Sequence, residues 1–196
     1  MVVIDCQLTM ADHVAALRRS CLFQLHQLRM VRSLLTLEAA KMLVHAFVSS
    51  RLDYCNSLLY GVSDGLLAKL QTVQNAAARV VTGTRKFDHI TPVMHQLHWL
   101  PVRQRITFKL AMITFKCLRG ALSYLDDVCI PVSSVVSRWQ LQSADSGTLV
   151  VPHTRTTIGR RDFAVSIPAT RNSLPVELRT LSLSSQTFVK NSKPFI

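Results

Sequence analysis

The sequence has little glycine, few acidic residues and no long apolar run. Its six glycines never cluster, so it lacks the phosphate-cradling loop typical of nucleotide-binding proteins. No window approaches the ~18 uninterrupted apolar residues that a membrane-spanning helix needs. The N-terminus has no basic stretch followed by an apolar run and a cleavage site, as a secretory signal would. We therefore expect an intracellular protein, in the nucleus or the cytoplasm, with no membrane partner.

Cysteine pairs are also missing. The five cysteines are odd in number and widely scattered, and none forms a C-x-x-C motif or lies close to a histidine. This spacing argues against a disulfide framework and against a zinc site. No nucleophile-elbow or cysteine-centred catalytic signature is present either. We expect no cofactor, no metal and no autonomous enzyme activity.

The sequence is rich in apolar residues and in positive charge. It is 196 residues long and 48% hydrophobic, which is enough to form a packed core rather than a disordered basic tail. Lys and Arg number 23 against 11 Asp and Glu, which gives a formal net charge of +12. Cations in such excess bind a phosphate backbone by releasing its counterions, so RNA or an RNA–DNA duplex is the expected partner.

Apolar spacing of three and four residues predicts helices over most of the first two thirds. The expected segments are residues 10–28, 36–54, 64–81, 92–98 and 102–119. In the second segment the predicted buried face is formed by Leu37, Ala40, Val44, Phe47, the stem of Arg51, and Tyr54. Gly83 and Gly120 stand where left-handed helix caps belong.

The amino-acid composition changes after residue 130, where Ser, Thr, Val and Pro dominate. Residues 147–151 resemble a short strand that ends at Pro152, with residues 155–158 as a pairing partner and weak alternation over 163–167. The predicted fold is therefore mainly α, a helical bundle with a small C-terminal β-hairpin and short-helix appendage. We expect a helical region over residues 1–130 and a small mixed region over 131–196 packed on it.

Three motifs carry competing interpretations. Residues 124–127 (YLDD) have the form of a polymerase metal site, but they follow a helix cap and favour the first turn of a short helix. His95 and His98 could share a metal, although capping or packing is the simpler role. Trp99 and Trp139 could stack on bases or belong to the core.

The candidate nucleic-acid-binding residues are chosen by charge and placement. Arg85 and Lys86 follow the Gly83 cap and should project from a loop, while Arg105, Lys109 and Lys116 share one helical stripe. The full set is Arg79, Arg85, Lys86, Arg103, Arg105, Lys109 and Lys116. The alternative is that these cations are solvated helix faces that keep the protein soluble.

Four strings in this order resemble a family. They are residues 50–59 (SRLDYCNSLL), 70–83 (LQTVQNAAARVVTG), 98–103 (HWLPVR) and 172–175 (NSLP). Together they are similar to the region downstream of the polymerase domain in non-LTR (LINE-type, jockey-like) retrotransposon reverse transcriptases. One departure is Arg171, which stands where a tryptophan is usual.

The resemblance implies that residues 1–130 are thumb-like and that the palm, with its metal-binding aspartates, is absent. It predicts a non-catalytic fragment of an RNA-directed DNA polymerase that binds template RNA or a primer–template duplex. The missing palm and fingers are a further expected partner. The competing hypothesis is an orphan protein or a protein-interaction scaffold with no role in nucleic-acid binding.

Overall fold

The computed structural model describes residues 2–134, 147–179 and 183–192. The chain divides into two compact units, Met1–Arg105 and Ile106–Ile196. No helix within the described ranges is both long and apolar enough to cross a bilayer.

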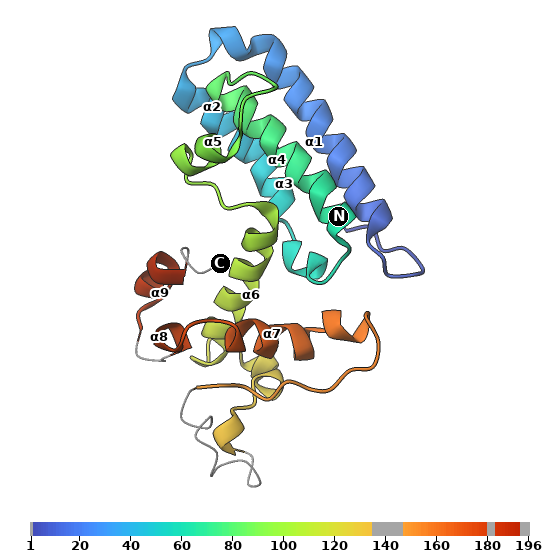
Figure 1. Cartoon of the computed structure of the whole chain (residues 1–196), viewed down its shortest axis with the longest axis vertical. Coiled ribbons are helices and arrows are strands. Elements are labelled where there is room, and N and C mark those ends of the chain that lie inside the picture. Colours follow the sequence, from blue (N-terminus) through green and yellow to red (C-terminus); the bar gives the residue numbers. More distant parts are fainter. Residues whose placement is uncertain (1, 135–146, 180–182, 193–196) are drawn as a thin grey trace. The chain divides into compact units, whose positions relative to one another are not determined.

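Unit 1 is helical, as predicted. Its helices are α1 (Ala11–Val31), α2 (Leu37–Val44), α3 (Ser50–Asp53), α4 (Asp64–Thr82) and α5 (Thr91–Gln96). Helices α1 and α4 lie side by side, and α2 packs against both (Figure 1). The helix predicted over residues 64–81 is confirmed as α4, and its apolar residues at spacings of three and four, Leu67, Leu70, Val73, Ala77 and Val80, are all buried.

Local signals set several helix ends. The Thr36 side chain accepts a hydrogen bond from the Ala39 N–H at 3.2 Å and so caps α2. Gly83 ends α4 at a φ of 74°, and its N–H bonds to the Arg79 carbonyl. At the start of α1, the Asp5 carboxylate and the Thr9 hydroxyl both accept the Ala11 N–H, each at 3.2 Å.

A π turn between α2 and α3 changes the buried face that was predicted for residues 36–54. Residues His45–Ser49 form this turn, which adds a residue to the helical repeat. Burial consequently passes from Val44 to Val48 and Leu52. Phe47, the stem of Arg51 and Tyr54 were predicted to face inward, but these residues are exposed. Leu37, at the start of α2, was predicted to be buried and is exposed as well. A uniform spacing rule could not anticipate this change of face.

Unit 2 begins within α6 (Val102–Cys117) and continues through α7 (Phe163–Asn172), α8 (Val176–Arg179) and α9 (Ser185–Ser192). The division lies at residue 105/106, whereas the sequence placed it at 130/131. The reason is the core of unit 2, to which α6 contributes Ala111 and Phe115. The Phe115 ring stacks on Phe188 with centroids 4.4 Å apart.

The predicted β-hairpin is not present among the described residues. Residues 147–150 make one isolated antiparallel bridge, Leu149 to Pro131, instead of pairing with 155–158. The Asn172 side chain occupies the other edge, because its amide accepts the Leu149 N–H and donates to the Leu149 carbonyl. The segment 163–167 is helical, since the Asp162 side chain caps α7.

Candidate functional site

A braced loop follows α4. The half-buried Arg79 guanidinium donates to the carbonyls of Arg85 and Asp88, at 3.3 and 3.2 Å. The Asp88 carboxylate in turn accepts the Arg85 N–H at 3.1 Å. These three hydrogen bonds hold residues 85–88 as a closed turn. Arg79 therefore positions the loop rather than presenting its charge to a ligand.

The loop presents two cations and an aromatic ring to solvent. Arg85 and Lys86 are exposed, and Phe87 is 91% exposed. The Lys86 ammonium lies 5.8 Å from the centroid of the Phe87 ring. Arg85 and Lys86 thus project from a loop, as the sequence predicted. Phe87 was missed, although an aromatic flanked by basic residues after a glycine cap was a readable signal.

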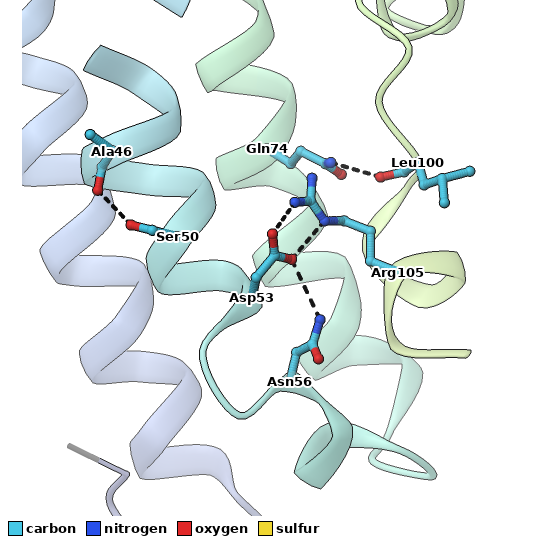
Figure 2. A network of polar contacts seen from close by, with 7 residues as sticks. All are labelled: Ala46, Ser50, Asp53, Asn56, Gln74, Leu100 and Arg105. Carbon is cyan, nitrogen blue, oxygen red and sulfur yellow. Dashed lines mark hydrogen bonds and ion pairs between the residues drawn. The ribbon is translucent and has the colours of Figure 1, made fainter. Parts of the chain in front are cut away.

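Two other candidate cations are engaged by carboxylates. The Arg105 guanidinium forms a bidentate ion pair with the Asp53 carboxylate, in which Nε lies 2.8 Å from Oδ1 (Figure 2). Its side chain is only 18% exposed, so Arg105 is largely withdrawn from solvent. Arg103 pairs with Asp64 on the surface. Phosphate would have to compete with Asp53 and Asp64 for these two arginines.

Three of the four sequence strings that carry the resemblance lie near the Arg105–Asp53 ion pair. The Gln74 side-chain amide donates to the Leu100 carbonyl at 2.8 Å (Figure 2). The side-chain oxygen of Gln71 accepts the Val102 N–H at 2.9 Å. Asn56 is 4% exposed and its amide reaches the Asp53 carboxylate. Hydrogen bonds therefore join residues 70–83 to residues 98–103, and residues 50–59 bind Arg105, which lies two residues beyond the third string. In this chain their polar side chains hold unit 1 together.

The remaining candidates, Lys109 and Lys116, lie in unit 2. Both are exposed, and both belong to α6 with a spacing of seven residues, which places them on one face of that helix. Of the seven predicted binding residues, Arg85, Lys86, Lys109 and Lys116 are the exposed ones whose side chains form no ion pair with a carboxylate among the described residues.

Unit 2 uses other arginines as internal donors. Arg171 is 2% exposed, and its guanidinium donates to the carbonyls of Gly147 and Arg179. Arg179 donates to the carbonyls of Leu174 and Asn172, both at 2.8 Å. Burial, with Arg179 nearby, lowers the pKa of Arg171 to about 10. Some of the arginines counted in the net charge therefore bind backbone carbonyls of unit 2 and are not displayed on its surface.

The structure shows where most of the motifs with competing interpretations lie. The backbone of 124–127 belongs to a 3₁₀ helix, Ser123–Val128, as the helical interpretation predicted. His95 and His98 are exposed, and Trp99 is half-buried. Trp139 lies outside the described residues. Among the residues that are described, no three His, Cys, Asp or Glu side chains are grouped to hold a metal ion.

Comparison of the chain with protein-family models, with curated proteins and with solved structures finds no match in any of the three. The resemblance to retrotransposon reverse transcriptases stays a prediction that residues 50–59, 70–83, 98–103 and 172–175 carry.

Proposed function

We propose that the chain binds the phosphate backbone of RNA or an RNA–DNA duplex, as a non-catalytic part of a retrotransposon reverse transcriptase. The observation that carries the proposal is the braced loop, which holds Arg85 and Lys86 in solvent beside the exposed Phe87 ring. A preformed loop loses little conformational entropy when it binds. Such a partner would place the protein in the nucleus or the cytoplasm.

Charge supports the same partner. Residues 1–105 hold 12 Lys and Arg against 6 Asp and Glu, and residues 106–196 hold 11 against 5. Each unit is therefore cationic by itself, and the excess does not come from one terminal tail. Cations on both units favour a polyanion, and phosphates bound by Lys and Arg release counterions.

The test is a fluorescence-anisotropy titration of a labelled single-stranded RNA and an RNA–DNA duplex at two salt concentrations. The test variant is Arg85→Gln/Lys86→Gln/Lys109→Gln/Lys116→Gln. The matched control, Arg18→Gln/Lys69→Gln/Arg155→Gln/Lys190→Gln, removes four exposed charges and takes two from each unit. Both variants carry the same net charge, so only the position of the charges differs.

We expect the test variant to bind far more weakly than the control, with a slope of log affinity against log salt that is shallower by about 3 for single-stranded RNA. Equal affinities of the two variants would show that binding follows net charge alone. Equal affinity of the test variant and the wild type would remove the proposal.

A protein-interaction scaffold is the second candidate, and exposed apolar side chains favour it. Around the end of α1, Met30 is 72% exposed and Leu34 is 84% exposed. Such side chains are typical of a surface that a partner covers. Sedimentation velocity distinguishes the two functions, because a scaffold should self-associate in the wild type and dissociate in Met30→Ser/Leu34→Ser, with no effect of RNA.

A further inference from the structure

Unit 1 contains an open cleft of about 650 Å³ between α1 and α3. Its walls are formed by the N-terminal segment, by one face of α1, and by α3 with the residue that follows it. The lining residues are Val3, His13, Ala16, Leu17, Ser20, Ser50, Arg51 and Tyr54. The volume lies within the roughly 300–1,000 Å³ that is usual for small-molecule sites.

The π turn creates the polar side of this cleft. With uniform α-helical spacing Arg51 and Tyr54 would face the core, but the extra residue in His45–Ser49 places Leu52 there instead. Tyr54 is 56% exposed and Arg51 is exposed, and both line the cleft. The Ser50 hydroxyl stabilises the turn by donating to the Ala46 carbonyl (Figure 2). Single π turns inside helices are frequent at functional sites.

The guanidinium of Arg51 is held in place. One of its N–H groups donates to the Ser20 hydroxyl across the cleft. A guanidinium has five N–H donors, so this contact orients Arg51 and leaves donors for a ligand. The lining residues include no carboxylate that could neutralise it. The electrostatics of the cleft therefore favour an anion over a cation.

The other walls are apolar or neutral. Val3, Ala16, Leu17 and the Tyr54 ring offer hydrocarbon surface. The imidazole of His13 is 7% exposed, and its Nδ1 accepts the Val3 N–H at 3.4 Å. Burial lowers the pKa of His13, which keeps the ring neutral near pH 7. One cation therefore stands at the side of an apolar groove.

We propose that this cleft binds a small amphiphilic monocarboxylate, with the carboxylate on the Arg51 guanidinium and the apolar body against Leu17 and the Tyr54 ring. Carboxylates match the planar fork of arginine and form charge-assisted hydrogen bonds with it. The site is separate from the braced loop at residues 85–88, and its ligand does not depend on the proposed binding of nucleic acid.

The test compares three probes of one shape: 4-phenylbutyrate, 4-phenylbutan-1-ol and 4-phenylbutylamine. Each is titrated into the full chain and followed by ¹H–¹⁵N chemical shifts and by calorimetry. We expect the carboxylate to bind at least about tenfold more tightly than the alcohol, and the amine to bind most weakly. The largest shifts should fall at Leu17, Ser20, Arg51 and Tyr54.

Two variants locate the ligand. Arg51→Gln removes the charge and should weaken the carboxylate about tenfold while it leaves the alcohol unchanged, whereas Arg18→Gln, an exposed cation on the same α1 that is outside the cleft, should alter neither. Ala16→Trp fills the groove from an exposed helical position and should abolish binding of both probes. A thermal melt verifies that each variant is folded.

The proposal is overturned if the carboxylate and the alcohol bind equally or if neither binds at 10 mM. It is also overturned if a folded Arg51→Gln variant retains the wild-type affinity. RNA binding by the Arg51→Gln and Ala16→Trp variants should equal that of the wild type. The braced-loop function can therefore fail without affecting this result, and this site can fail without affecting RNA binding.

Discussion

Arg105 and Asp53 form a bidentate ion pair that joins the first turn of α6 to the end of α3, although the two residues are 52 positions apart in the sequence. The Asp53 carboxylate also accepts from the buried Asn56 amide. Arg105, selected from the sequence for phosphate binding, is therefore a structural residue of unit 1.

Asp53→Asn should destabilise unit 1 by about 1–3 kcal/mol, because it leaves a mostly buried guanidinium without its charged partner. Asp64→Asn, which removes the acid of the exposed Arg103 pair, should cost at most about 1 kcal/mol. Urea unfolding followed by far-UV circular dichroism measures both. Equal losses of unfolding free energy in the two variants would contradict the conclusion that the Arg105–Asp53 pair is the more buried of the two.

The glycines at the two ends of α4 should respond in opposite directions to substitution by alanine. Gly83 adopts a φ of 74°, where a Cβ is strained although no atom lies within 4 Å of its position, so Gly83→Ala should destabilise by about 1 kcal/mol. Gly65 lies in the first turn of the same helix with equally open space, and Gly65→Ala should stabilise by up to about 1 kcal/mol. Thermal melts compare them, and a gain in stability from Gly83→Ala would contradict the cap.

Acidification should destabilise unit 1 through His13. Burial lowers the pKa of His13 in the folded chain below its ordinary value of 6.5, so the unfolded chain takes up the proton first. The free energy of unfolding therefore falls as pH drops below about 6.5, until the folded chain is protonated as well. His13→Gln should flatten this dependence, whereas His26→Gln, an exposed change on α1, should leave it intact. Melts from pH 7.5 to 5 decide between these outcomes.

Arg171→Met should loosen unit 2. The change removes the N–H groups that bind the carbonyls of Gly147 and Arg179 and leaves both acceptors without that donor. We expect a loss of about 2–4 kcal/mol and faster amide exchange at Leu149 and Val150. Arg155→Met, at an exposed position, is the matched control and should change exchange at neither residue.

Phe87→Ala should discriminate between forms of nucleic acid. A ring that is 91% exposed can stack on an unpaired base, which is worth about 1–3 kcal/mol. The variant should therefore lose roughly 5- to 150-fold in affinity for single-stranded RNA and little for a duplex. Phe47→Ala, another exposed phenylalanine of unit 1, should alter neither affinity in the same anisotropy assay. Equal losses for the single strand and the duplex would argue against stacking.

Local sequence patterns predicted most helices because their signals lie within a few residues of each other. The apolar spacing of α4 and the Gly83 cap are cases that the structure confirms. The strand at 147–151 was wrong because its edge is occupied by the Asn172 side chain, 23 residues from Leu149. No local pattern contains that contact.

The sequence by itself determined that the chain is helical and strongly cationic, since helix caps, apolar spacing and charge are properties of neighbouring residues. The tertiary structure decided which cations reach solvent. Arg79, Arg105 and Arg171 bind groups within the fold, while Arg85 and Lys86 project from a braced loop. It also decided which face of α3 is open, because one extra residue in a π turn rotates every side chain that follows.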